Sequence, residues 1–279
     1  MSFKNKIIKN LLLILVSGIA FTACKKLDRP KLGDYPKDAN APGGPLKFYA
    51  AFDGTTSNPL MNAVDSIRAN FPSSNPLKSI DGIKGKGIQG NGTQAINYPS
   101  ANDFKGSTSC TISLWVNNTV NPNTELYFSL VSKDYWHGSA AFLLVEHATP
   151  TACTFKFALE DHWVEYPNKS FTKPLFDGQW HHLAFTYDES SSKVSIYFDG
   201  QPVPTPGTSG TLMDNGAPLG KLNLAHASNL VVGGWNKHAG LDGPTDSWIS
   251  GFTGKMDQFR LYGKVLSASE ILALFNSKL

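Results

Sequence analysis

Four tryptophans with polar neighbours are the residues best suited to bind a ligand. Trp136, Trp163 and Trp235 lie in the segments KDYWHG, EDHW and GGWNKH, and Trp248 follows a long loop. Aromatic faces match the flat C–H faces of sugar rings, and Asp, Asn, His and Lys side chains can bond the hydroxyl groups around them. For each tryptophan taken alone, packing against the base of a loop is an equally good interpretation.

The connection 233–248 is predicted to bring these side chains together. Loops of this length in compact domains are typically functional or disordered, and two tryptophans argue against disorder. We expect it at the end of a sheet, beside the loops that carry Trp136 and Trp163, where it would form a groove with aromatic walls. The predicted ligand-binding residues are Trp136, His137, Trp163, Trp235, Lys237, His238, Asp246 and Trp248.

Catalytic chemistry has weaker candidates. Glycosidases need two carboxyl groups, one as the acid and one as the nucleophile or base. Glu160, Asp161 and Glu165 are the nearest cluster of this kind, but neighbouring residues of a strand point to opposite faces. The chain also has no G-x-S-x-G and no H-E-x-x-H motif. We therefore predict that the protein is not an enzyme.

A glycine-rich stretch contains a literal G-x-G-x-x-G at Gly85, Gly87 and Gly90. A dinucleotide-binding loop of this form must follow a strand and open a helix. Here Asn91-Gly92 follows instead, which is a hairpin signal. We assign these glycines to turns and bulges.

The elements that must position these residues are strands. Over Gln179–Gly200, apolar and polar residues alternate, a turn-like segment follows at 188–193, and the alternation resumes at Val194, which predicts a β-hairpin with one buried face. Such a hairpin needs an opposing sheet. Trp115 and Trp180 lie in alternating strands and are expected in the core. Further strands are predicted at 46–52, 111–116, 126–132, 141–146, 154–159, 229–233 and 254–262.

Many strands without intervening helices indicate an all-β fold, a single two-sheet antiparallel sandwich. Only the C-terminus has a helix signal. Ser267 and Glu270 form a capping box, and apolar residues follow them. We therefore predict a short C-terminal helix.

The N-terminus predicts export. Lys4, Lys6 and Lys9 precede the short apolar run Leu11–Phe21, and Thr22-Ala23-Cys24 follows, which is typical of a secretory signal and resembles the lipobox of bacterial lipoproteins. We predict a signal peptide over 1–23, a lipidated Cys24 and a flexible tether over 24–45, rich in Pro, Gly and charge. A plain secretory leader is the alternative.

Charge and cysteine content narrow the function further. Removing residues 1–23 lowers the formal net charge from +3 to zero, so nucleic-acid binding is not expected. Cys110 and Cys153 each begin a strand-like run. In an exported protein they could pair as a disulfide or remain two buried thiols, and the sequence leaves both open.

The order of several motifs resembles a known family. Trp180-His181-His182-Leu183-Ala184 followed by Tyr197-Phe198-Asp199-Gly200, together with the strand 111–116 and the C-terminal run Gly254–Tyr262, is similar to the core of laminin-G-like jelly rolls. The resemblance covers about 46–279 and implies a concanavalin A-like lectin/glucanase sandwich, a jelly roll with a curved face and rim loops that often bind glycans. It does not fix a function.

The same resemblance bears on catalysis and on metal binding. Glucanases of this superfamily carry E-x-D-x-x-E, which this chain lacks. Members often hold a calcium ion between the end of the first strand and the last strand, and the matching positions here are Asp53 and Asp257. Calcium takes six to eight oxygen ligands, so backbone carbonyls would have to complete its shell. Turn formation by Asp53 and hydrogen bonding by Asp257 are the alternatives.

These observations together predict a non-catalytic, lipid-anchored module of the cell envelope, on the outer membrane, that binds carbohydrate through an aromatic-lined rim groove. The first alternative is a structural or protein–protein interaction component of an outer-membrane assembly. The second is a glycoside hydrolase with an unusual acid pair.

Overall fold

The structure is a computed structural model that describes residues 44–53, 64, 77–206, 210–243 and 245–278. All but two of the residues in the predicted signal peptide and tether precede residue 44, so the signal peptide, Cys24 and nearly all of the tether lie outside the described residues. The residues described here belong to the unit 36–279. None of their helices is both long and apolar enough to cross a membrane.

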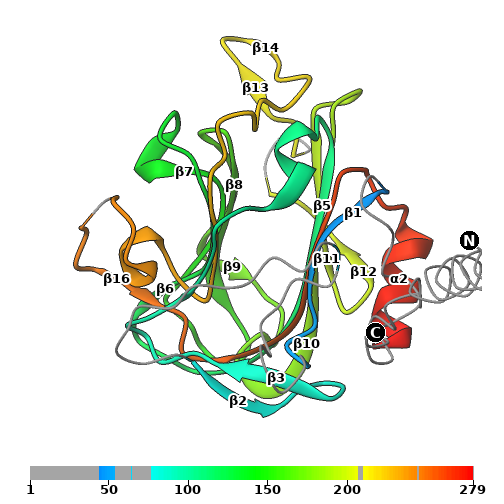
Figure 1. Cartoon of the computed structure of the whole chain (residues 1–279). Coiled ribbons are helices and arrows are strands. Elements are labelled where there is room, and N and C mark those ends of the chain that lie inside the picture. The colour runs from blue at the N-terminus through cyan, green and yellow to red at the C-terminus, as the bar shows by residue number, and fades with distance from the viewer. Residues whose placement is uncertain (1–43, 54–63, 65–76, 207–209, 244, 279) are drawn as a thin grey trace, which may run out of the picture. The chain divides into compact units, whose positions relative to one another are not determined.

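Two large sheets form the sandwich of the described chain (Figure 1). The eight-stranded sheet has the order β12-β11-β10-β5-β17-β3-β2, with β1 paired to β17. Its strands are β1 (Leu46–Ala50), β2 (Lys78–Asp81), β3 (Lys86–Gln89), β5 (Cys110–Thr119), β10 (Asp177–Asp188), β11 (Lys193–Phe198), β12 (Gln201–Val203) and β17 (Lys255–Tyr262).

The seven-stranded sheet has the order β4-β15-β6-β7-β8-β9. Among the described strands of this sheet, only β16 runs parallel to its neighbour, β6. The strands are β4 (Ile96–Tyr98), β6 (Thr124–Val131), β7 (Ser139–Glu146), β8 (Cys153–Leu159), β9 (His162–Phe171), β15 (Leu230–Val232) and β16 (Ile249–Gly251). The smaller elements are the hairpin of β13 (Met213–Asp214) and β14 (Ala217–Pro218), the 3-10 turns η1 (Asn102–Gly106), η2 (Trp136–Gly138) and η3 (Asn236–Ala239), and the helix α2 (Ala268–Ser277).

The main core lies between the two sheets, where apolar side chains alternate along each strand. Phe155 and Phe157 of β8 stack on Phe185 of β10, with ring centroids 5.8 and 4.4 Å apart. The predicted all-β jelly-roll sandwich with a short C-terminal helix is confirmed. The predicted capping box is confirmed as well: the Ser267 hydroxyl accepts the Glu270 N–H, and the Glu270 carboxylate accepts the Ser267 N–H.

The outer faces of the two sheets differ. That of the eight-stranded sheet, the covered face, lies under α2: Trp115 stacks on Phe275 of the helix with centroids 5.6 Å apart, and Ile271 joins a buried cluster with Leu46 and Tyr49. That of the seven-stranded sheet, the open face, carries Phe142, Leu144, Glu146, Lys156, Ala158, Trp163 and Glu165, since cross-strand partners share a face.

Three sequence predictions need correction. The hairpin of β10 and β11 is buried on both faces, because α2 covers the side that holds His182 and Ala184. Trp180 is half-buried near the start of β10 and does not belong to the core. Strand β9 (His162–Phe171) was not among the strands predicted from the sequence.

The two cysteines are separate thiols. Both are buried and free, and burial raises the pKa of each to about 12. The glycine-rich stretch forms the turn between β2 and β3, where Gly85 has a φ of 71° that suits glycine. The predicted assignment to turns holds for Gly85, whereas Gly87 lies within β3 and Gly90 directly after it.

Candidate functional site

Two exposed tryptophans meet on the open face. The rings of Trp136 in η2 and Trp163 in β9 lie 5.9 Å apart at an interplanar angle of 56°. They are 42% and 47% exposed, so a large part of each indole faces solvent. Sequence reasoning predicted that the loops holding these two residues lie beside the 233–248 connection. The structure instead brings the two rings into contact with each other.

The pair is held by its surroundings. Trp136 packs on Phe142 of β7 at 5.9 Å, and its backbone N–H donates to the Asp161 carboxylate in the β8–β9 turn. Trp163 stands opposite Ala158 of β8, a small residue that leaves room for the indole. Strand β7 and the β8–β9 turn thus hold Trp136, and pairing with β8 holds Trp163.

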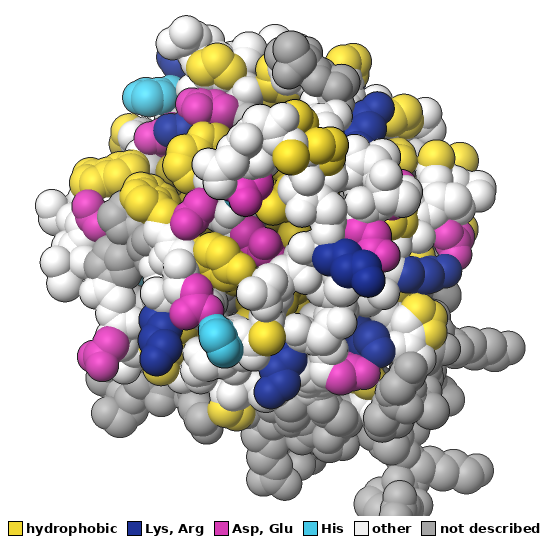
Figure 2. Space-filling model, turned by 90° about the horizontal axis from the view of Figure 1, so that it is seen from above, with side chains coloured by type: hydrophobic (Ala, Val, Ile, Leu, Met, Phe, Trp, Pro, Cys, Tyr) yellow, Lys and Arg dark blue, Asp and Glu magenta, His cyan; other side chains and the backbone are white. Residues whose placement is uncertain are grey.

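Further contacts fasten the loop that carries Trp136. The Tyr135 hydroxyl donates to the backbone oxygen of Asn223 at 2.7 Å. Asp134 pairs with the exposed His226, so the 223–226 segment is connected to this loop twice. Figure 2 looks down on the end of the sandwich where η2 and the β13–β14 hairpin project in Figure 1, and acidic side chains lie there among exposed hydrophobic ones.

The three carboxylates of the acidic cluster each contact a group of the chain. Glu160 is buried and accepts the Asn223 N–H, and burial raises the pKa of its carboxyl group. Asp161 accepts the Trp136 N–H, and Glu165 faces Lys156. Their observed contacts are therefore with the rim and the open face rather than with each other.

A row of charged residues crosses the open face beside the tryptophans. The Lys156 ammonium on β8 lies 2.8 Å from Glu146 Oε2 on β7 and 3.5 Å from Glu165 Oε1 on β9. Burial alone would lower the pKa of Lys156, but the hydrogen bond and charge of Glu146, followed by those of Glu165, outweigh it and raise that pKa. Sequence reasoning missed this row. Its available signal was the alternation Phe155, Lys156, Phe157, which puts the lysine on the face opposite the core.

The remaining predicted residues lie elsewhere. Trp235 is 1% exposed and packs against Phe142, Leu144 and Ile249 on the β6 side of the open face, so the prediction of a binding wall at Trp235 is wrong. The physical reason is the η3 turn, in which the buried His238 accepts the Trp235 backbone N–H through Nδ1 at 3.0 Å. Burial lowers the pKa of His238 to about 4, so it acts as a neutral acceptor and is not available as a rim contact.

Lys237, Asp246 and Trp248 bind one another. The Lys237 ammonium donates to the Asp246 backbone oxygen, and the Trp248 indole N–H donates to the Asp246 carboxylate at 3.2 Å. Trp248 is half exposed, but no ring contact joins it to the Trp136–Trp163 pair within the described residues. Of His137, the structure places only the backbone, in η2. The predicted groove is therefore an exposed pair on a sheet face, with the 233–248 segment packed beside it.

The predicted calcium ligands Asp53 and Asp257 meet at the β2–β3 turn. Asp53 accepts the Lys86 N–H at 2.5 Å, and Asp257 Oδ2 accepts the Ile83 N–H at 2.8 Å. The second oxygen of Asp257 is buried with no hydrogen-bond partner among the described residues. Burial, followed by the charge of Asp53, raises the Asp257 pKa to about 8.

This arrangement fits a cation in part. A buried carboxylate oxygen without a partner, close to a second carboxylate, is a setting in which a cation relieves an unfavourable charge. Among the described residues, no group of three or more His, Cys, Asp or Glu side chains is arranged to hold a metal, so backbone oxygens would have to supply the other ligands.

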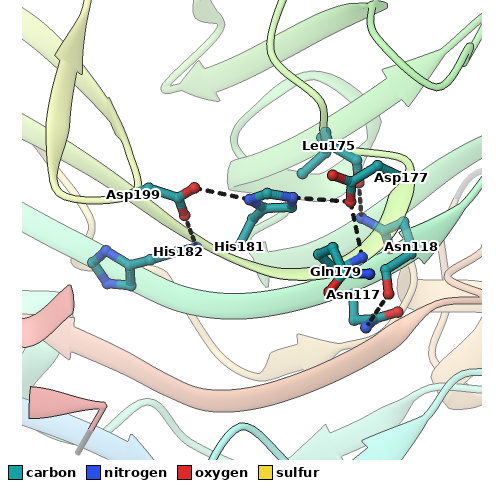
Figure 3. Close-up of polar contacts among 9 residues, drawn as sticks. Asn117, Asn118, Leu175, Asp177, Gln179, His181, His182 and Asp199 are labelled. Carbon is teal, nitrogen blue, oxygen red and sulfur yellow. Dashed lines mark hydrogen bonds and ion pairs between the residues drawn. The ribbon is translucent and has the colours of Figure 1, made fainter. Parts of the chain in front are cut away.

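The hairpin motif around His181 and Asp199 has a structural use that sequence reasoning did not identify. Figure 3 shows His181 between two aspartates: Nδ1 lies 2.9 Å from Asp199 and Nε2 lies 3.1 Å from Asp177. Asp199 also accepts the His182 backbone N–H at 2.8 Å. The imidazole stacks on Phe198 at 4.7 Å. These contacts fasten the β9–β10 connection to the turn after β11.

Comparisons with known proteins agree with this architecture. The family model described as the concanavalin A-like lectin/glucanases superfamily matches residues 90–272. A search of curated proteins finds no match. Among solved structures, domain 4 of a GH43 extracellular arabinanase from Geobacillus stearothermophilus, in complex with arabinotriose, is 19% identical with a TM-score of 0.54. That match covers 82% of this chain and 97% of the other.

Two further structures are similar over most of this chain but over less of their own. A Trypanosoma rangeli sialidase in complex with sialic acid is 16% identical with a TM-score of 0.56, and the match covers 85% of this chain and 33% of the sialidase. The binding domain of Paraclostridial Mosquitocidal Protein 1 is 16% identical with a TM-score of 0.55, with 84% and 52% covered. At these identities the likeness shows the fold alone.

Proposed function

We propose, from the premise that this chain belongs to the concanavalin A-like lectin/glucanases superfamily, that it binds carbohydrate on its open face without catalysing a reaction. The observation that carries the proposal is the exposed pair of Trp136 and Trp163, whose rings touch and whose positions are fixed by Asp161 and Phe142. Two tilted indoles offer apolar faces to a sugar ring, and the nearby carboxylates and lysine can bond its hydroxyl groups.

The site supports binding better than hydrolysis. A glycosidase pair needs two carboxyl groups facing a shared substrate position, roughly 5–10 Å apart. Glu160, Asp161 and Glu165 instead contact Asn223, Trp136 and Lys156. If incubation with the bound polysaccharide released reducing ends, the non-catalytic part of the proposal would be wrong.

A protein-interaction role would favour a broad apolar patch. The exposed large hydrophobic residues among those described are few and spread over several elements, and they are Val120, Trp136, Trp163, Met213, Trp248 and Val265. Only Trp136 and Trp163 form a ring contact with each other. Carbohydrate binding is therefore the function we favour.

The test is a polysaccharide panel followed by affinity measurements. Arabino-oligosaccharides and sialylated glycans belong on the panel because similar structures are described with arabinotriose and sialic acid. Trp163→Ala should weaken binding about ten-fold, on the order of 1–2 kcal/mol, with the fold intact. Trp248→Ala is the matched control, since it removes an equally exposed indole outside the pair. Equal losses in both variants would move the site toward β16.

We also propose that the protein is lipid-anchored at Cys24 and faces the cell envelope. The support is the basic start, the short apolar run and Thr22-Ala23-Cys24. Cys24→Ser should release the protein from the membrane fraction or leave its leader uncleaved. Unchanged lipid-dependent association of this variant with membranes would exclude the anchor.

Calcium would be a structural ion in this proposal. Asp53 and Asp257 would hold it, and it would join the end of β1, the β2–β3 turn and β17. These elements belong to the eight-stranded sheet, whereas the open face belongs to the seven-stranded sheet. The ion would therefore stabilise the domain and take no part in sugar contact.

A further inference from the structure

The charged row Glu146–Lys156–Glu165 lies on the same face as the tryptophan pair. On β8 and β9 it is two residues from the pairing of Ala158 with Trp163. Ala158 pairs with Trp163, and Lys156 pairs with Glu165. Residues two apart on a strand lie about 7 Å from each other, which is comparable with the length of one sugar unit. A glycan seated on Trp163 would therefore reach this row with its next unit.

We propose that this row is a specificity subsite that accepts neutral glycans and rejects anionic ones. The inference rests on the proposed function, because it assumes that the open face is where sugar binds. It assigns roles to Glu146, Lys156 and Glu165 that the tryptophan pair alone does not require.

The charges of the row carry the argument. Two carboxylates surround one ammonium, so the row is net negative, and Lys156 is already engaged by both partners. A sugar carboxylate placed here would meet two like charges and would have to compete for a neutralised lysine. Asp161, at the rim beside Trp136, adds a further negative charge on the approach.

The chemistry of the row suits a neutral sugar. Carboxylate oxygens accept hydrogen bonds from hydroxyl groups, and an ammonium has three N–H donors, of which two are directed at Glu146 and Glu165. The Glu146 side chain is 12% exposed and that of Lys156 is 28% exposed, so the row is held in place and is screened by salt less than free surface charges. The fixed acceptors and the remaining donor can bond hydroxyl groups on adjacent carbons.

The experiment compares neutral and anionic probes on the full chain. The probes are arabinohexaose, xylohexaose and cellohexaose on one side and hexagalacturonate on the other, with affinities measured by calorimetry. The wild type should bind at least one neutral probe and should bind hexagalacturonate at least ~10-fold more weakly. The double variant Glu146→Gln/Glu165→Gln frees Lys156 and should raise the affinity for hexagalacturonate about ten-fold, with a smaller loss for the neutral probe.

A matched control removes the same number of charges elsewhere. Asp81→Asn/Asp214→Asn alters two exposed aspartates on β2 and β13, which are not strands of the seven-stranded sheet. It should leave the ratio of neutral to anionic affinity unchanged. If the control shifted this ratio as much as the glutamate variant did, net charge and not the row would set specificity, and the inference would be overturned.

Failure of the inference and failure of the proposed function look different. If Trp163→Ala abolished binding while the glutamate variant kept the wild-type ratio, the sugar site would stand and the role of the row would be wrong. A wild type that prefers hexagalacturonate would also overturn it. If no probe bound, both would fail. If the glutamate variant does not fold, the wild type alone can test the inference. Raising the salt concentration should then reduce the difference in affinity between the neutral and the anionic probes. A difference independent of salt would refute the inference.

Discussion

Trp115 on the covered face is 1% exposed beneath α2, whereas Trp163 on the open face is 47% exposed. Trp115 stands on the central strand β5 between His182 and Asp257, and Trp163 stands on the edge strand β9 opposite Ala158. Both make aromatic contacts. The two outer faces also differ in what covers them. Helix α2, which follows the last strand, folds over the eight-stranded sheet. On the seven-stranded sheet, the described chain covers only the side near β6, with Trp235 and Ile249. Tryptophan on one face thus contributes to stability, and on the other it is free to contact a ligand.

The largest expected difference is in stability. Trp115→Ala should lower the free energy of unfolding by about 3–5 kcal/mol, because it removes a fully buried ring and its stacking on Phe275. Trp163→Ala should lower it by less than about 1 kcal/mol, since nearly half of that side chain already faces water. Urea denaturation of both variants checks this. Similar losses would mean that the two faces do not differ as described.

A second difference concerns metal. The calcium site proposed at Asp53 and Asp257 belongs to the eight-stranded sheet. If it is filled, a chelator should lower the melting temperature, and an ion at a hundred times its Kd would contribute about 2.7 kcal/mol. Asp257→Asn should abolish this sensitivity while sugar binding at the open face persists. A melting curve indifferent to chelator would leave both aspartates as hydrogen-bond acceptors for the β2–β3 turn.

The third and smaller expected effect concerns the N-terminal cap of α2, whose removal should lower the stability of the covered face. Ser267→Ala removes the hydroxyl that accepts the Glu270 N–H and should cost about 1 kcal/mol. The Lys264 and Ser267 contacts lower the Glu270 pKa to about 2, so this carboxylate stays charged over the working pH range. Hydrogen exchange should show faster opening of α2 and unchanged protection in β7 and β8. Uniform acceleration would show that α2 does not open separately.

The sequence was informative where periodicity decides the structure. Alternation predicted β5, β6, β7, β8, β10, β11 and β17 within a few residues, and the Ser267–Glu270 pair predicted the start of α2. It failed where one residue type serves two environments. Trp235 lies between glycines and polar residues like an exposed rim residue, yet the η3 turn and His238 carry it inward. Such burial depends on a contact between segments, which local spacing does not encode.

The site was predicted in part for the same reason. The sequence placed the loops at 136 and 163 beside the 233–248 connection, because of the length and position of that connection. It did not reveal that Trp163 belongs to strand β9 and contacts Trp136 from there. The row Glu146–Lys156–Glu165 needs the register of three strands, and no motif announces it. Register is fixed by packing of the whole sheet.

The two neighbouring histidines of β10 provide the finest test, because they face opposite sides of the sheet. His182 lies on the covered face, where burial lowers its pKa to about 3. Between pH 3 and about 6.5 this histidine is protonated in the unfolded chain but not in the folded one. The free energy of unfolding should therefore rise with pH over this range.

His181 should act in the opposite direction and at higher pH. Burial alone would lower its pKa, but the hydrogen bonds and charges of Asp199 and Asp177 outweigh it and raise that pKa above the unfolded value of about 6.5. The stability that protonated His181 contributes is therefore fully present below about pH 6.5 and is lost as pH rises through the raised value. Melting temperatures from pH 6 to 9 should fall with this slope in the wild type and stay flatter in His181→Gln. Asp199→Asn should flatten the profile as well, since its amide oxygen can still accept the His182 N–H while the charge that favours protonated His181 is gone. A slope that survives both substitutions would assign it to other groups, and the contrast between the two histidines would then rest on His182 alone.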